Sequence, residues 1–357
     1  MSTNFAKAIN SALHDEMKQD DKVLVFGLGV ADAKGVFGTT TGLQAKFGKS
    51  RVFDIPLSEN ALTGAALGMS MNNMKPILVH QRADFVFTSA EQIINQIAKT
   101  YFTSGGKFSA PLVIRMIVGR GWGQGPTHAQ SPHSIFANVP GLKILLPATP
   151  EDAYCMLRKS VQDPDPVLFI EHRWLYQNES NFEGLDNSIS HTGCQVLLQG
   201  GDLTMVGISL GAIEALKIAK VFNFFGLKIE VINLRSVVPL DTHAIIKSVQ
   251  KTRKLAIFDI AHTKFGVSTT ISENIMRAMW NKLNYPPLII GLKNIPVPSS
   301  AMLAKQIYPS SLNVTLQINS EFGFGIKQDF LVEKFLEIWP TVSEFDDQPD
   351  KGLIGPF

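Results

Sequence analysis

Short apolar runs rich in β-branched residues alternate with longer segments of helical periodicity along this chain of 357 residues. This alternation constrains the fold more than any other feature, because it is the pattern of βαβ units, in which helices connect parallel strands. We therefore predict an α/β fold built on mostly parallel sheets. Since the chain is longer than one hydrophobic core usually requires, we expect two domains.

The predicted elements of the first half fall into two sets. Helices fit residues 4–17, the segment that begins near Glu59, residues 89–102 and residues 149–161; the last begins with the helix-start residues Thr149, Pro150 and Glu151. Strands are expected at 22–27, 51–55, 76–80, 111–118, 142–147 and 166–171.

Periodicity is lost near residue 175, where polar and turn residues dominate, and a second α/β unit follows. Its strands are expected at 203–210, 228–234, 254–260 and 286–292. From about residue 312 the only clear pattern is a helical one at 330–339. We predict a first domain at 1–180, a linker at 181–198, a smaller second domain at 199–320, and a C-terminal helix and tail at 321–357.

The charge pattern excludes several classes of protein. The 33 basic and 31 acidic residues are spread without a basic tract, so we expect no nucleic-acid partner. No apolar run of membrane-spanning length or signal-peptide type is present, so we expect a cytoplasmic protein without membrane contact. The two cysteines, Cys155 and Cys194, are too few for a disulfide framework or a zinc site.

Nucleotide-binding motifs are incomplete, but one glycine-rich loop is distinctive. Residues 27–32 lack the third glycine of a dinucleotide-binding fingerprint, and no P-loop occurs. Residues 119–133 follow a predicted buried strand, at the end of a parallel sheet where ligands commonly bind. His128 in this loop is a candidate for proton transfer, although such a loop can also be only a flexible turn. The alternating glycines are Gly119, Gly121, Gly123 and Gly125.

Gln81, Arg82 and Phe85 follow the next predicted strand and are expected near the same sheet edge. Phe85 and Phe87 either belong to the core or form a stacking wall for a flat heterocycle.

Glu59 heads a helix of unusually small residues. In the structural interpretation Ser58 caps the helix and the carboxylate favours the helix dipole. In the functional one, close packing buries Glu59, which then needs a partner and has a perturbed pKa. The small residues that favour burial are Gly64, Ala65, Ala66 and Gly68.

Taken together, residues 5–311 resemble the β subunits of the thiamine-diphosphate-dependent 2-oxoacid dehydrogenase E1 component, of the pyruvate and branched-chain type, within the transketolase-like superfamily. The resemblance implies a pyrimidine-binding domain followed by a transketolase C-terminal-like domain. It rests on the order and spacing of GVFGTTTGLQAKFG, RVFDIPLSENALTGAALGMS, ADFVF, SGGKFSAPLVIR, THAQSP, PGLKILLPATPEDA, DPDPVLFIEHRWLY, VINLRSVVPLD and NIPVPSS.

The resemblance assigns roles to the singled-out residues. It implies that Glu59 hydrogen-bonds N1′ of the thiamine aminopyrimidine and favours its imino tautomer, so that the cofactor can deprotonate its own C2. It implies that Phe85 packs on the aminopyrimidine, with Gln81 and Arg82 near the cofactor. His128 is implied to assist the substrate and the acyl transfer.

The resemblance also implies partners and ions. The chain has no GDG motif, so an α subunit is expected to hold the diphosphate and Mg²⁺ in an α₂β₂ assembly, with a 2-oxo acid as substrate and a lipoyl carrier as acyl acceptor. Many family members hold a structural potassium ion, mainly through backbone carbonyls. The corresponding residues here are Leu112, Ser160, Val161, Asp163 and Asp165.

Departures from the family pattern leave alternatives open. Leu28 replaces a family acid, Arg82 replaces a common phenylalanine, and Ala129 stands where serine often follows the histidine. Arg82 either meets a substrate carboxylate or phosphate, or pairs with Asp84 or the α subunit. A split-subunit transketolase-like carboligase and a non-catalytic scaffold are the alternative functions.

Overall fold

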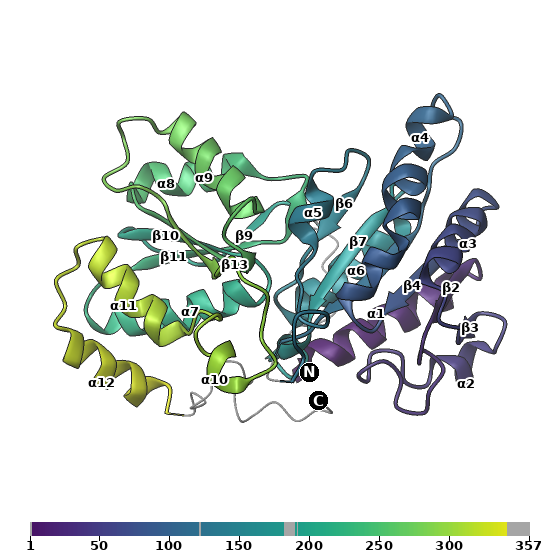
Figure 1. Ribbon diagram of the computed structural model, residues 1–357, viewed down its shortest axis with the longest axis horizontal. Helices are drawn as coiled ribbons and strands as arrows, with labels where there is room; N and C mark the ends of the chain where they lie inside the picture. The colour runs from purple at the N-terminus through teal and green to yellow at the C-terminus, as the bar shows by residue number, and fades with distance from the viewer. Residues whose placement is uncertain (1, 121–122, 182–189, 191, 341–357) are drawn as a thin grey trace.

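The computed structural model describes residues 2–120, 123–181, 190 and 192–340, which form two α/β domains side by side (Figure 1). A seven-stranded sheet organises the first domain and a five-stranded sheet the second. A short antiparallel pair, β1 (Ser2–Asn4) with β8 (Glu179–Asn181), joins the start of the chain to the end of the first domain. The predicted α/β class with two sheets is confirmed.

The first sheet has the strand order β12-β6-β7-β5-β4-β2-β3 and is parallel except for β12. Its central strands are buried on both faces, which explains why they appear in the sequence as continuous apolar runs. The strands are β2 (Val23–Gly27), β3 (Val52–Phe53), β4 (Lys75–His80), β5 (Val113–Val118), β6 (Lys143–Leu145), β7 (Val167–His172) and β12 (Ser236–Val238).

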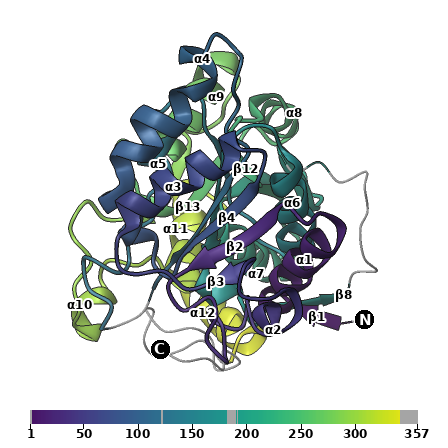
Figure 2. The ribbon, with the colours of Figure 1, turned by 90° about the vertical axis from the view of Figure 1, so that its right-hand side faces the viewer.

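Helices cover both faces of this sheet. Figure 2 shows α1 (Phe5–Gln19) and α6 (Pro150–Gln162) on one face and α3 (Glu59–Met71) on the other. The start of α6 is fixed as predicted, because Thr149 and Asp152 form a capping box. The smaller helices are α2 (Leu43–Phe47), α5 (His133–Ala137) and η4 (Arg173–Leu175).

The helix predicted at 89–102 is irregular rather than continuous. The chain passes through the 3₁₀ helix η1 (Ala83–Ser89), the π-helical turn η2 (Gln92–Gln96), η3 (Ile97–Lys99) and α4 (Thr100–Thr103). The helical periodicity therefore predicted the overall path but not the hydrogen-bond pattern.

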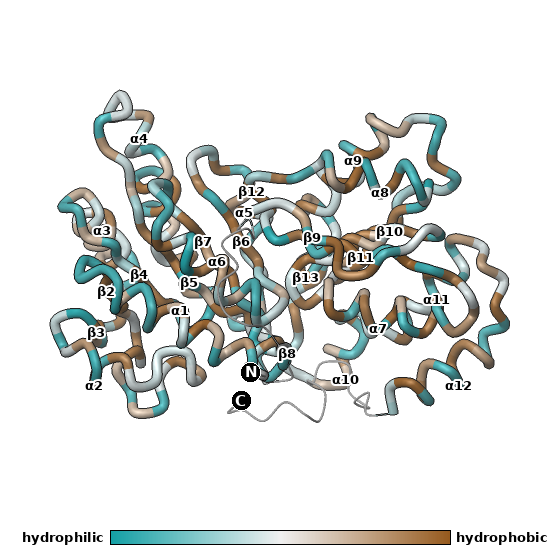
Figure 3. Tube along the Cα trace, turned by 180° about the vertical axis from the view of Figure 1, so that it is seen from behind, coloured by the Kyte–Doolittle hydropathy of each residue, from teal (hydrophilic) through white to brown (hydrophobic). Residues whose placement is uncertain are grey.

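The second sheet has the order β14-β13-β10-β11-β9, with only β9 antiparallel. Its strands form a hydrophobic centre in the tube of Figure 3. The strands are β9 (Cys194–Leu198), β10 (Leu203–Gly207), β11 (Ile229–Leu234), β13 (Leu255–His262) and β14 (Leu288–Leu292). The helices are α7 (Leu210–Phe224), α8 (Thr242–Thr252), α9 (Val267–Ala278), α10 (Ala301–Ala304), α11 (Ser311–Glu321) and α12 (Gln328–Ile338).

Two segments depart from the predicted organisation. β9 lies inside the range 181–198 predicted as a linker, so the second sheet begins earlier; residues 182–189 and 191 of that range lie outside the described residues. β12 follows β11 directly but pairs antiparallel with β6 of the first sheet. The two domains are thus joined by β12. A strand of three residues is too short to be predicted from sequence periodicity.

The C-terminal region holds more structure than predicted. Helix α12 corresponds to the predicted helix at 330–339, whereas α11 was not predicted. Both pack on α7 and bury apolar residues such as Ile318 and Phe335 in the second core. Residues 341–357 of the predicted tail lie outside the described residues. Among the helices described, none is both long enough and apolar enough to cross a bilayer.

Candidate functional site

The residues singled out from sequence gather at the carboxyl edge of the first sheet. Gln81 follows β4, His128 lies in the loop after β5, and Glu59 begins the helix after β3. In the strand order the end of β5 lies between those of β4 and β7. Neighbouring strands are about 4.8 Å apart, so the loops after β4, β5 and β7 meet at one place.

Glu59 is the first residue of α3 and is half-buried. The expected capping bond from Ser58 is absent, because the Ser58 side chain makes no cap hydrogen bond and its backbone does not adopt the usual extended cap conformation. The Glu59 carboxylate has no hydrogen-bond or ion-pair partner among the described residues. It is therefore available to a ligand at the sheet edge.

The small residues of α3 do not bury Glu59 as expected. Thr63, Ala66 and Ser70 form the buried face of the helix, whereas Ala65 and Gly68 are exposed. A Cβ added at Gly68 would meet nothing within 4 Å. Of the four small residues, Ala66 is buried and Gly64 packs against Gln92, whereas Ala65 and Gly68 face away from the sheet. The close packing therefore leaves Glu59 only half-buried in the single chain.

Phe85 and His128 lie against each other in an edge-on arrangement. Their ring centroids are 5.7 Å apart at an interplanar angle of 83°, and both side chains are half-buried. The Thr127 hydroxyl lies 3.0 Å from His128 Nδ1. Phe87 instead stacks on Phe136 in the core, so the two phenylalanines have the two different environments that sequence left open.

Asp84 connects the Phe85 helix to the His128 loop. Its Oδ1 accepts hydrogen bonds from Gln130 N at 3.2 Å and from Gln130 Nε2 at 2.8 Å. Burial raises the pKa of the Asp84 carboxyl, while the Gln130 donors and the nearby His128 act in the opposite direction. Asp84 thus fixes His128 relative to Phe85.

The second domain supports the His128 loop from the other side. Gly123 N donates to Ser299 O at 3.0 Å, and Ser131 Oγ donates to Ile260 O at 3.0 Å. Gly119 permits the loop's close return, because a Cβ there would lie 2.4 Å from His128 O. Gly121 lies outside the described residues.

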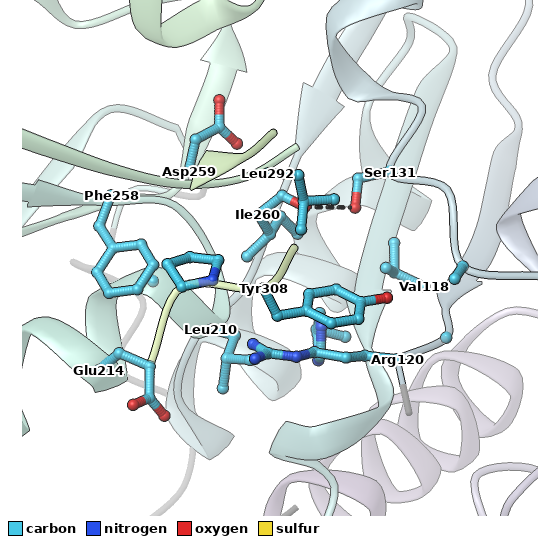
Figure 4. A pocket seen from close by; sticks show the side chains of 15 residues that line it. Val118, Arg120, Ser131, Leu210, Glu214, Phe258, Asp259, Ile260, Leu292 and Tyr308 are labelled. Atoms are coloured by element: carbon cyan, nitrogen blue, oxygen red, sulfur yellow. Dashed lines mark hydrogen bonds between the residues drawn. The ribbon is translucent and has the colours of Figure 1, made fainter. Parts of the chain in front are cut away.

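A small cavity of about 20 Å³ lies behind this loop, between the domains (Figure 4). Arg120 is held there between the Trp174 and Tyr308 rings, with its guanidinium carbon 4.4 Å and 4.3 Å from their centroids. Asp259 also lines the cavity and accepts a hydrogen bond from His133 Nε2 at 3.0 Å. A cavity of this size has room for about one water molecule, so it is not a substrate site.

Gln81 joins the ends of β4 and β2. Its Nε2 donates to Leu28 O at 2.7 Å. Gly29, at φ +74°, lets the Gln81 amide lie against the backbone, since a Cβ there would be 2.3 Å from Gln81 Nε2. This contact fixes the Leu28 loop; the contact of Gln81 with a cofactor stays a prediction.

Arg82 does not form the ion pair with Asp84 that sequence left open. Within the described residues Arg82 has no acidic group at ion-pair distance, and its guanidinium carbon lies 5.4 Å from the centroid of Phe37. Arg173, which follows β7, lies against the same ring at 5.6 Å. Burial lowers the pKa of both arginines, and the charge of Arg82 contributes to lowering the pKa of Arg173 to about 10.

The residues of the predicted potassium site already make other contacts. The Asp163 carboxylate accepts hydrogen bonds from Lys143 Nζ at 2.6 and 2.7 Å, and Lys143 also pairs with Asp165 at 3.0 Å. The carbonyls of Leu112 and Ser160 accept backbone N–H groups. Val161 is a buried residue of α6. Potassium binding here remains a prediction.

The residues at this edge fit one half of a thiamine site. The exposed part of Phe85 offers an aromatic face, and the Glu59 carboxylate comes from α3, which packs on the helix that carries Phe85. Within the described part of the chain, no group of three His, Cys, Asp or Glu side chains could hold a metal ion. The Phe85 ring and the Glu59 carboxylate are groups that could hold an aromatic nitrogen heterocycle at this edge.

Comparison with known proteins defines the class first. Residues 1–179 match the pyrimidine-binding domain of transketolase, and residues 193–314 match the transketolase C-terminal domain. A solved structure titled "Split gene transketolase, inactive beta4 tetramer" superposes with a TM-score of 0.71 at 18% identity, covering 89% of this chain and 97% of that chain. At that identity the likeness concerns the fold alone.

Curated relatives define the family. The β subunit of the Rickettsia felis pyruvate dehydrogenase E1 component is 32% identical over 88% of this chain and 96% of its own length. The β subunit of the Bacillus subtilis 2-oxoisovalerate dehydrogenase is 39% identical over 76% of this chain and 85% of its own length. The chain belongs to the family of 2-oxoacid dehydrogenase E1 β subunits.

Sequence reasoning missed the residues that position the site. The roles of Asp84, Gln130 and Ser299 depend on contacts between distant segments, although all three lie in motifs that carry the family resemblance. Arg173 also lies in such a motif. Its proximity to Arg82 could be foreseen only from the strand order that places β7 and β4 on either side of β5.

Proposed function

We propose that this chain is the β subunit of a thiamine-diphosphate-dependent 2-oxoacid dehydrogenase, which decarboxylates a 2-oxo acid and transfers the acyl group to a lipoyl carrier. The main support is the contact of Phe85 with His128 at the sheet edge, with Glu59 at the start of α3, the helix that packs on the one carrying Phe85, in a chain whose relatives are E1 β subunits. When bound, thiamine diphosphate supplies the carbon nucleophile and the electron sink for decarboxylation.

Each residue at this edge has a task that its surroundings support. Glu59 would hold a proton at the aminopyrimidine ring nitrogen, since no group of the described residues engages its carboxylate. Phe85 would orient the ring by stacking and exclude water from one face. His128, held against Phe85 and beside Thr127, would hold or move a proton at the substrate oxygen.

We further propose that an α subunit completes the site in an α₂β₂ assembly. The described part of this chain has no cluster of metal-ligating side chains, which supports a partner that holds the diphosphate and Mg²⁺. The exposed Ala65 and Gly68 would permit close approach of another chain to α3, the helix that begins with Glu59. A structural potassium ion at the predicted carbonyls belongs to the same proposal.

Calorimetric titration of thiamine diphosphate with Mg²⁺ tests the split site. We expect little binding to this chain alone and strong binding after addition of the α subunit encoded beside it. Tight, Mg²⁺-dependent binding by the isolated chain would contradict the split site, and absence of binding in the mixture would favour a non-catalytic scaffold.

A carboligase built from split subunits is the second candidate. Arg82 and Arg173 favour it, because two neighbouring arginines with no acidic partner among the described residues suit an anionic carbonyl acceptor such as a sugar phosphate. Reduction of lipoyl domains separates the candidates. A dehydrogenase E1 component would acylate them in the presence of a 2-oxo acid, whereas a carboligase would turn over without them.

A further inference from the structure

Arg173, which is buried, and Arg82, which is half-buried, differ from two other arginines of the domain in having no carboxylate partner among the described residues. Arg115 in β5 is fully buried, but Glu171 accepts hydrogen bonds from its Nε and Nη2 at 2.6 and 2.9 Å. Arg158 in α6 donates to Glu16 at 2.6 Å. Arg82 and Arg173 have no such carboxylate within the described residues. A buried charge without a partner is costly, so it usually indicates a bound group of opposite charge.

The acids nearest to the two arginines are already engaged. Glu171 precedes Arg173 by two residues, but its carboxylate binds Arg115 and accepts the Tyr176 hydroxyl at 2.8 Å. Burial lowers the pKa of Arg82 and the charge of Asp84 opposes this, but Asp84 forms no ion pair with Arg82: its Oδ1 binds Gln130, and its Oδ2 has no hydrogen-bond partner in the described structure. His172 adds no negative charge, and burial together with Arg120 and Arg173 keeps its pKa well below the ordinary value.

Arg173 supplies independent evidence for a ligand. Arg173 is only 5% exposed, and its Nη1 is buried without a hydrogen-bond partner in the described structure. A buried guanidinium nitrogen is seldom left unpaired. Nη1 of Arg115 is also buried without a partner, but Glu171 neutralises that arginine, whereas Arg173 has no carboxylate partner among the described residues. Its position after β7, with Arg82 after β4, places the two residues on either side of the strand that leads to His128.

The loop beneath the arginines is rigidly held. Phe37, against which both guanidinium groups lie, belongs to a turn that is closed by a hydrogen bond from Thr39 Oγ1 to Val36 O at 2.7 Å. The same Thr39 hydroxyl accepts a hydrogen bond from Arg115 Nη2 at 3.2 Å. The arginine pair is therefore preorganised and does not depend on a flexible loop, which favours binding of a small anion.

We propose that Arg82 and Arg173 form a binding site for an oxyanion, a carboxylate or a phosphate, carried by the small-molecule reactant at a position remote from its reacting carbonyl. The statement that the anion belongs to the reactant rests on the proposed function, whereas the binding of an anion by the two arginines does not. Guanidinium groups bind both anions through paired N–H donors. The reactant is accordingly a 2-oxo acid with a second carboxylate or a phosphorylated carbonyl compound.

Direct binding to the full chain tests the anion site without requiring turnover. Inorganic phosphate and 2-oxoglutarate are titrated separately by calorimetry at constant ionic strength, with pyruvate as the reactant that lacks a second anion. We expect saturable binding of at least one dianion, stronger than that of pyruvate, and at least a tenfold weakening in Arg82→Gln and in Arg173→Gln, about the loss of one charge-assisted hydrogen bond. Preference for phosphate indicates a phosphorylated reactant, and preference for 2-oxoglutarate a dicarboxylate.

Matched variants separate the site from general effects of charge. Arg277→Gln removes an exposed arginine on α9 and should leave binding unchanged. Arg173→Gln should also raise the melting temperature of the ligand-free chain, because it removes an unpaired buried charge. Absence of dianion binding to the wild-type chain would overturn the proposal. The proposal would also fail if the Arg82→Gln/Arg173→Gln double variant bound the dianion as the wild type does but no longer assembled with the α subunit. That result would show that the two arginines form a subunit contact.

Failure of the proposed function gives a different result. If the mixture with the α subunit binds no thiamine diphosphate while the dianion titration still depends on both arginines, the anion site stands and the E1 assignment fails. The opposite pair of outcomes would retain the E1 assignment and remove the anion site.

Discussion

The carboxyl edges of the two sheets carry similar polar residues but use them differently. At the second sheet, Arg235 Nε and Asn233 Nδ2 each donate to Asp152 at 2.7 Å, and Asp259 accepts from His133 at 3.0 Å. Each of these contacts joins the second domain to the first. In each contact a buried carboxylate accepts a hydrogen bond across the domain boundary, which favours a single arrangement of the two domains.

At the first sheet the corresponding charges are left without partners. Glu59, Arg82 and Arg173 make no ion pair within the described residues, although they lie at the same kind of strand end. The difference indicates that the second edge maintains the domain arrangement, and it supports the proposal that the first edge binds ligands. Unpaired polar groups that break the usual rule of satisfaction are expected at functional sites.

The largest expected effect comes from Glu59→Gln in the assembled α/β complex. The change removes the proton-holding group while preserving its size, so we expect activity to fall by about 10²- to 10⁴-fold. Initial rates of 2-oxo acid turnover provide the measurement, and circular dichroism checks the fold. Glu321→Gln, on the exposed end of α11, is the matched control. Unchanged activity of Glu59→Gln would contradict the functional role proposed for the edge of the first sheet.

Asp152→Ala tests the structural side. The Asp152 carboxylate is fully buried and binds Arg235, so its loss leaves a buried arginine unpaired, and we expect a loss of about 3–5 kcal/mol in the free energy of unfolding. Urea denaturation measures this loss. Asp21→Ala removes the carboxylate of an exposed pair with Arg51 and should cost no more than about 1 kcal/mol. Equal costs for the two variants would contradict the comparison.

The first edge should also make the chain sensitive to acid. Burial lowers the pKa of His80, the last residue of β4, from 6.5 to about 4. Between these pH values the unfolded chain binds a proton at His80 that the folded chain does not. The contribution of His80 to the free energy of unfolding is therefore fully present above pH 6.5 and is lost as the pH falls toward 4. We expect about 2 kcal/mol to be lost from pH 7 to pH 5, and His80→Gln to remove that share. Parallel pH profiles of the two proteins would contradict this expectation.

The smallest expected effect distinguishes the two helix starts. Thr149 forms a capping box at α6, so Thr149→Ala should cost about 1 kcal/mol. Ser58 makes no cap bond at α3, so Ser58→Ala should change the free energy of unfolding by less than about 0.5 kcal/mol. Thermal melting of both variants measures the difference. Equal destabilisation by the two changes would show that Ser58 caps α3 after all.

Much of the fold could be predicted because it depends on local patterns. The strand at 166–171 is a continuous apolar run, and the helix at 149–161 has its start residues in the sequence. The shared strand β12 could not be predicted, since Ser236–Val238 is too short for periodicity and its partner β6 lies far away in the chain. The irregular helix after Ser89 was hidden for a related reason, because its apolar spacing remains helical.

The residue types of the candidate site could likewise be read from the sequence, whereas the spatial contacts between these residues could not. By itself the sequence determined the α/β class and the family, because periodicity and motif order are written along the chain. It also predicted Glu59, Phe85 and His128 as the candidate site residues. Only the tertiary structure decided that Asp84 holds the His128 loop, that Ala65 and Gly68 lie exposed, and that Arg82 and Arg173 share one ring without a counter-ion. These relations depend on strand order and on the packing of segments distant in sequence, and no local pattern encodes them.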